Sequence, residues 1–123
     1  MRCSGCGKCC YETEMELSSE DIKRLVDAGY SPEDFIIIRD GVSRLRNVDG
    51  WCYFYSPAEK KCRVYSIRPL GCRLYPVVYV EREGAALDEF CPMRHTVSKG
   101  EFRRKAKILK KLLEEIARER VLR

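Results

Sequence analysis

The clearest hydrophobic pattern in the chain lies at its C-terminal end. Apolar residues there recur at steps of three and four, which places them on one face of an α-helix. They are Phe102, Ala106, Leu109, Leu113 and Ile116. Ser98 and Glu101 stand before this run at the spacing of a capping box. The pattern predicts an amphipathic helix over residues 99–121.

Two shorter helices are predicted in the N-terminal third of the chain. Ser18 is a candidate N-cap with Asp21 three residues later, and Ile22 and Leu25 begin an apolar face that ends before Gly29. A second, short helix is predicted to start within residues 31–34, where proline occupies the first helical position.

Short runs of β-branched and aromatic residues predict strands. Residues 35–39 and 42–45 flank Asp40-Gly41, a dipeptide typical of a tight hairpin turn. Residues 51–55 and 77–81 are further strand candidates. Because short strands occur beside helices rather than in regular alternation with them, the pattern indicates an α+β fold.

Length and composition fit one small domain. A chain of 123 residues that is 45% hydrophobic and 35% charged can bury only a modest core. No segment approaches the roughly 20 apolar residues of a membrane span, and the first residues lack the basic and apolar regions of a secretory signal. We therefore expect a soluble, cytoplasmic protein that does not associate with membranes.

The net charge of +5 is unevenly distributed along the chain. From residue 99 onward there are ten lysine or arginine residues and four glutamates, a net charge of +6, whereas residues 1–98 sum to −1. Such a basic helix can neutralise nucleic-acid phosphates. A basic face turned to solvent is the simpler interpretation, and we favour it.

Eight cysteines are the strongest functional signal. Four of them open the chain in the run Cys3-x-x-Cys6-x-x-Cys9-Cys10. Steps of two intervening residues let a tight loop wrap one metal centre, and thiolates bond well to zinc and iron. Disulfides and reactive thiols are the alternatives, but cysteines in a reducing cytosol normally serve metal or redox chemistry. Metal ligation is the preferred interpretation.

The other four cysteines are spread out, and most stand beside a turn former. They are Cys52, Cys62, Cys72 and Cys91. Loop positions of this kind bring ligands from different elements together, although a free cysteine is also often a buried apolar side chain. We predict that all eight cysteines are metal ligands in a single, small, metal-stapled α+β domain over residues 1–123. Residues 1–97 form its metal-binding body and residues 98–123 its C-terminal helix.

These residues also carry a resemblance to a known family. The opening cysteine run, the string Arg68-Pro69-Leu-Gly-Cys72-Arg73-Leu-Tyr75-Pro76 and the late Cys91-Pro92 resemble the YkgJ-type cysteine-cluster family. This is the CxxCxxCC group, described as a zinc- or iron-chelating domain. The resemblance covers about residues 3–92 and implies a metal-binding module. A related cysteine-rich segment in flagellin lysine methylases is associated with an iron–sulfur cluster.

Two metal layouts fit eight thiolates. In one, Cys3, Cys6 and Cys9 hold three irons of a [4Fe–4S] cluster, and Cys91, which proline follows, supplies the fourth ligand. In the other, the cysteines form one or two zinc sites of four thiolates each. Adjacent Cys9 and Cys10 favour the cluster, because neighbouring side chains diverge and rarely chelate one small ion together.

The remaining candidate residues add little chemistry of their own. Arg68 and Arg73 are predicted to contact the cofactor and offset the charge of its thiolates. His95 is the only histidine, so no catalytic constellation is visible beyond the metal site. We expect a protein that holds an iron–sulfur cluster, in preference to zinc, as a redox, accessory or carrier module. The alternative is a zinc-stapled interaction module that binds nucleic acid or a partner protein, whose identity the sequence does not indicate.

Overall fold

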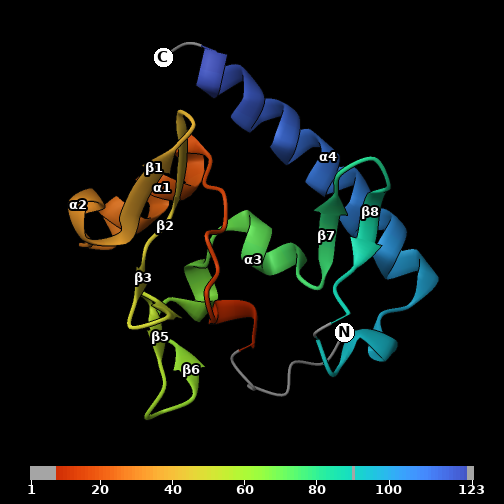
Figure 1. Ribbon diagram of the computed structural model, residues 1–123, viewed down its shortest axis with the longest axis horizontal. Coiled ribbons are helices and arrows are strands. Elements are labelled where there is room, and N and C mark those ends of the chain that lie inside the picture. Colours follow the sequence, from red (N-terminus) through yellow and green to blue (C-terminus); the bar gives the residue numbers. More distant parts are fainter. Residues whose placement is uncertain (1–7, 90, 122–123) are drawn as a thin grey trace.

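The computed structural model describes residues 8–89 and 91–121 (Figure 1). Its helices and strands are short, apart from a long C-terminal helix that runs along one side of the molecule. In chain order they are α1 (Ser19–Asp27), α2 (Pro32–Phe35), β1 (Ile36–Arg39), β2 (Val42–Leu45), β3 (Asn47–Val48), β4 (Trp51–Cys52), β5 (Tyr55–Ser56), β6 (Lys61–Cys62), α3 (Leu70–Leu74), β7 (Val77–Val80), β8 (Gly84–Leu87) and α4 (Lys99–Val121). Single 3-10 turns occur at Lys8–Cys10, Tyr65–Ile67 and Arg94–Thr96.

The first helix begins at the predicted cap. The Asp21 backbone N–H donates to the Ser18 hydroxyl oxygen at 3.2 Å, and the Ser18 N–H donates to Asp21 Oδ2 at 3.1 Å. This reciprocal pair satisfies two N–H groups that the helix itself leaves without partners. Leu25, on the apolar face, is completely buried. Helix α2 begins at Pro32, also as predicted.

Within the described residues, the strands pair with one another only as antiparallel hairpins, and single bridges add Tyr11 to Trp51 and Glu16 to Arg44. Strands β1 and β2 join through Asp40 and Gly41, whose φ angles of 54° and 76° lie in the left-handed region that a tight hairpin turn requires. Strand β7 pairs with β8, which the sequence pattern did not predict. The prediction of one strand over residues 51–55 was wrong in its continuity, since β4 pairs back to β3 and β5 pairs forward to β6.

A turn at Tyr53 and Phe54 separates these two hairpins. In a continuous strand, Phe54 and Tyr55 would point to opposite faces. The turn instead buries both side chains together with Cys52, and the Phe54 ring packs 5.4 Å from that of Phe35. Burial of Cys52, Phe54 and Tyr55 therefore outweighs strand continuity.

Buried apolar residues form two clusters. The N-terminal cluster consists of Leu17, Leu25, Phe35, Leu45, Cys52, Phe54, Tyr55 and Val64. The helix cluster consists of Val42, Leu74, Val77, Leu109, Leu112 and Ile116, and it packs α4 against α3 and the β7–β8 hairpin. Leu112 joins the buried face of α4, although the periodic pattern did not include it.

The far end of α4 reaches back to the start of α1. The Ser19 backbone N–H and hydroxyl both donate to the Glu119 carboxylate, at 3.0 Å each. The structure confirms the α+β class with short antiparallel strands and a long terminal helix, whereas stapling by metal stays a prediction. Across the described residues, no helix combines the length and the apolarity that crossing a lipid bilayer requires.

Candidate metal centre

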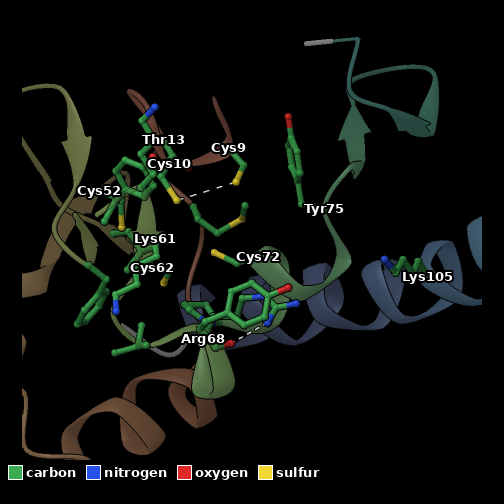
Figure 2. Close-up of a pocket in the computed structure, with 18 of the residues that line it drawn as sticks. Cys9, Cys10, Thr13, Cys52, Lys61, Cys62, Arg68, Cys72, Tyr75 and Lys105 are labelled. Carbon is green, nitrogen blue, oxygen red and sulfur yellow. Dashed lines mark hydrogen bonds between the residues drawn. The ribbon is translucent and has the colours of Figure 1, made fainter. Parts of the chain in front are cut away.

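Five cysteines from separate parts of the chain line one cavity of about 540 Å³. Cys9 and Cys10 come from the first 3-10 turn, Cys52 from β4, Cys62 from β6 and Cys72 from α3. Figure 2 shows their sulfur atoms turned toward the same space. The cavity lies between the N-terminal cluster and the first turns of α4, which contribute Glu101 and Lys105 to its wall.

Two small hairpins hold Cys52 and Cys62 in place. Cys52 pairs with Asn47 in the first and Cys62 with Tyr55 in the second. Backbone hydrogen bonds extend both ladders, from Tyr53 N–H to the Arg46 carbonyl at 2.9 Å and from Arg63 N–H to the Phe54 carbonyl at 2.7 Å. Strand pairing therefore fixes the direction of these two thiols.

The segment after Cys10 is bound to the first hairpin. The Glu12 N–H donates to the Gly50 carbonyl at 2.6 Å, and the Tyr11 ring packs edge-on against Trp51. Gly50 has a φ of 87°, and a Cβ there would lie 3.2 Å from the Tyr11 ring. Glycine at this turn therefore allows the Cys9–Cys10 segment to lie close to β4.

Cys72 approaches the cavity from α3, beside a second close contact. A Cβ at Gly71 would lie 2.5 Å from the Met15 sulfur. Met15 also lines the cavity, so the missing side chain lets this wall pack against α3 next to Cys72.

Burial controls the protonation of most of these thiols. It raises the pKa of Cys52 to about 11 and also raises the pKa values of Cys62 and Cys72. The protonated forms therefore predominate at neutral pH in the metal-free protein. A bound metal would have to displace these protons, as thiolate sites generally require.

Cys9 and Cys10 form an unequal pair, with their sulfur atoms 3.9 Å apart. The hydrogen bond with Cys10 lowers the pKa of Cys9 to about 7, and the charge of Arg68 contributes to the shift. The same hydrogen bond raises the pKa of Cys10. Cys9 is therefore the cavity thiol that ionises most readily.

Of the two predicted arginines, the structure brings one to the cavity. Arg68 lines it, donates to the Tyr65 carbonyl at 2.7 Å and stacks its guanidinium 4.0 Å from the centre of the Tyr65 ring. Arg73 lies exposed on α3, outside the cavity lining. Successive helix positions point about 100° apart, and α3 turns Cys72 toward the cavity and leaves Arg73 exposed.

Three cationic residues on the wall were not predicted from the sequence. They are Lys60, Lys61 and Lys105. Lys61 pairs with Glu59 at 2.9 Å, and Lys105 pairs with Glu101 at 2.8 Å in a mostly buried ion pair. The four-residue spacing of Glu101 and Lys105 on one helix was a visible signal of that pair, but its position at the cavity was not.

The remaining predicted ligands lie elsewhere or outside the described residues. Cys3 and Cys6 fall outside them. Cys91 is buried and does not line the cavity. Burial and a hydrogen bond donated to Asp88 raise the pKa of Tyr75, a cavity-wall residue, and Cys91 contributes a smaller part of that shift. His95 is exposed. Within the described part of the chain, no cysteine belongs to a disulfide bond.

The donor chemistry fits a metal, but the thiols surround a volume rather than a point. Among the described residues, no three ligand-type side chains are close enough together to hold a single ion. Sulfur nevertheless dominates the donors on the wall, with Glu101 as the one carboxylate of the described lining. Such a set suits thiophilic centres such as zinc or iron–sulfur.

Comparison with known proteins supports this assignment of chemistry. The family model CxxCxxCC, described as "Putative zinc- or iron-chelating domain", matches residues 2–92. An uncharacterized protein of Methanocaldococcus jannaschii is 34% identical over an alignment 90 residues long, which covers 67% of this chain. The chain spans 47% of the length of that relative. No solved structure matches the chain.

Proposed function

Since the chain belongs to the CxxCxxCC family, for which chelation of zinc or iron is the family description, we propose that its cavity holds a [4Fe–4S]-type iron–sulfur cluster. Its role would be that of a redox, accessory or carrier module. When bound, such a cluster exchanges single electrons. The cavity cysteines, with Cys3 and Cys6 from the same opening motif, are the pool from which its ligands would come.

The arrangement of the five cavity thiols carries this proposal. A single zinc ion needs four sulfurs that converge at about 2.3 Å from one centre. The five described thiols instead line the wall of a cavity of about 540 Å³. A polynuclear cluster, whose metal atoms are separated, is better suited to ligands spaced around a volume.

The charges on the wall support a thiolate-bound centre of either kind. Four thiolates leave a zinc ion or a [4Fe–4S] cluster with a net negative charge, which nearby cations stabilise. The charge of Arg68 adds to the lowering of the Cys9 pKa by its hydrogen bond with Cys10, and at Cys62 it partly offsets the rise in pKa that burial causes, so it favours the thiolate form of both. Lys60, Lys61 and Lys105 add positive charge to the same wall.

Anaerobic purification followed by metal and sulfide analysis tests the proposal. We expect a brown protein that contains iron and acid-labile sulfide in similar amounts. A colourless protein with stoichiometric zinc and no sulfide would contradict it.

A pair of serine variants tests the location of the centre. Cys52→Ser removes a thiol from the cavity wall, and we expect it to lower metal content sharply. Cys91→Ser is the comparison variant, since Cys91, the fourth cluster ligand of the sequence-based layout, is equally buried but does not line the cavity; if the cavity alone supplies the ligands, this variant keeps its metal. Loss of metal in Cys91→Ser with full retention in Cys52→Ser would place the centre elsewhere.

The exposed face of α4 favours a second candidate function, binding of nucleic acid by a zinc-stapled module. Arg104, Lys107 and Lys111 are exposed on this helix, opposite its buried apolar face. Replacing all three with glutamate should abolish binding and its salt dependence while metal content is unchanged. If the native protein fails to bind DNA or RNA at low salt, α4 is a structural element alone.

A further inference from the structure

Helix α1 contains a buried charged residue whose contacts extend beyond the helix. Only 2% of the Asp21 side chain is exposed. Its Oδ2 accepts the Ser18 N–H, which completes the capping box. Its Oδ1 accepts the Leu70 N–H at 3.0 Å and a guanidinium N–H of Arg24 at 2.8 Å. One carboxylate oxygen of Asp21 therefore completes the helix cap, and the other bonds to Arg24 and to the backbone at Leu70.

Arg24 binds the same segment one turn further along α1. Its Nε donates to the Ile67 carbonyl at 3.3 Å, and one of its terminal nitrogens donates to the Arg68 carbonyl at 3.1 Å. The planar guanidinium can make these bonds together with the one to Asp21 because its donors form a rigid fork. Asp21 and Arg24 thus form hydrogen bonds with the backbone groups of residues 67, 68 and 70.

Residues 67–70, which these hydrogen bonds hold, lead directly to the cavity. It carries Arg68, which lines the wall, and it continues into α3, where Cys72 presents its sulfur to the same space. Pro69 lies between them and is almost fully buried. The segment is otherwise a loop between a 3-10 turn and a five-residue helix, which have few backbone bonds of their own.

We propose that Asp21 and Arg24 are positioning residues that hold residues 67–70 so that Arg68 and Cys72 face the cavity. The part of this inference that concerns metal binding rests on the proposed function. A capping box alone requires neither the burial of Asp21 nor the participation of Arg24, because an exposed aspartate caps equally well. A carboxylate buried to this extent is retained only where its hydrogen bonds are satisfied, and here the loop supplies one of the partners.

The test uses the full chain and the variant Arg24→Gln, which removes the forked donor but leaves the apolar face of α1 intact. Asp21→Asn is a second variant that keeps the shape of the side chain. Lys23→Gln is the matched control, since Lys23 lies on the same helix in an exposed ion pair with Asp27. All variants are first compared by far-UV circular dichroism and by unfolding midpoint, so that measurements are made on folded protein.

We call the contacts of Asp21 and Arg24 with residues 67–70 the clamp. Two measurements separate the effect of the clamp from that of metal binding. In metal-free, reduced protein, alkylation of Cys72 by iodoacetamide, followed by mass spectrometry, reports how often α3 leaves its place. In anaerobically reconstituted protein, the rate at which metal is lost to a chelator reports the stability of the centre. For Arg24→Gln we expect Cys72 to react several-fold faster and metal to be lost about tenfold faster, the lower end of the effect of removing outer partners of metal ligands.

The outcomes distinguish this inference from the proposed function. If Arg24→Gln and Asp21→Asn match Lys23→Gln in the alkylation rate of Cys72, the clamp is overturned whatever the metal result. If the wild-type protein takes up no metal, the proposed function fails, and the alkylation arm still decides the clamp. Faster alkylation of Cys72 in both clamp variants, with the control unchanged, supports it.

Discussion

Cysteine side chains of the same chemistry meet different environments around the cavity. Cys52 and Cys72 sit against the N-terminal cluster, where burial raises their pKa values. The hydrogen bond with Cys10 lowers the pKa of Cys9, and the positive charge of Arg68 lowers it further. Reactivity at the scale of single residues therefore differs within one site.

Cys9 should be the most reactive cavity thiol of the metal-free, reduced protein. Because the thiolate is the nucleophile and its pKa is about 7, alkylation of Cys9 should rise with pH around neutrality. Cys52, with a pKa of about 11, should react slowly throughout that range. Iodoacetamide labelling with peptide mass spectrometry measures both sites together, and equal rates at pH 7 would contradict the assignment.

Gly71→Ala should destabilise the protein, because the new methyl group would lie 2.5 Å from the Met15 sulfur. We expect a loss of about 1 kcal/mol in the free energy of unfolding, since overpacking outweighs the better helix propensity of alanine. Urea denaturation measures the difference.

Two further variants make this prediction specific. In a Met15→Ala background the added methyl group has room, so Gly71→Ala should cost much less. Gly100→Ala in α4 is the control, since a Cβ there meets only an ordinary contact with Arg104 at 3.5 Å. Equal destabilisation at Gly71 in both backgrounds would exclude the steric explanation.

At the scale of elements, α4 provides both part of the cavity wall and half of the buried residues in the helix cluster. Leu109, Leu112 and Ile116 are buried against α3, β7 and β8. The same helix places the Glu101–Lys105 ion pair at the cavity and bonds α1 through Glu119. It lies outside the residues that the family model matches. Packing of this helix should therefore affect the metal-binding body that it covers.

Leu112→Ala should lower the free energy of unfolding by about 3 kcal/mol, through lost burial and the cavity left behind. Leu112 is only 3% exposed. Ile108→Ala, on the same helix, removes a side chain that is 42% exposed and should cost about 0.5 kcal/mol. Chemical denaturation of both variants provides the comparison, and similar losses would mean that α4 does not pack as described.

For the whole molecule, the cavity joins parts that are far apart in the chain. Its wall draws on the opening 3-10 turn, two hairpins, α3 and the start of α4. Each of these parts has few backbone bonds to the others, so a bound metal would link segments that apolar packing joins only in part. Metal binding should consequently stabilise the folded chain as a unit.

Removal of metal should lower the melting temperature and broaden the transition. A metal that binds only the folded state adds about 2.7 kcal/mol when its free concentration is 100 times its dissociation constant. Differential scanning calorimetry of the loaded and the chelator-treated protein, with metal content verified, measures the change. Superimposable melting curves would show that the two apolar clusters alone maintain the fold.

The sequence by itself was sufficient for features that depend on neighbouring residues. The capping box at Ser18, the Asp40-Gly41 turn and the full extent of α4 each follow from local backbone geometry and from periodicity over a few turns. The cysteine spacing likewise predicted thiolate chemistry, which the family match supports.

Only the tertiary structure decided which side chains share the cavity. It placed Cys72 and Arg68 on the cavity wall and left Arg73 outside it. It also brought Lys105 to the same wall as cysteines that are far away in the chain. It also showed that Asp21, the capping-box partner of Ser18, bonds to the backbone of Leu70, 49 residues further along the chain. Such relations depend on how loops and helices pack to bury apolar surface, and that packing is a property of the whole chain rather than of any local pattern.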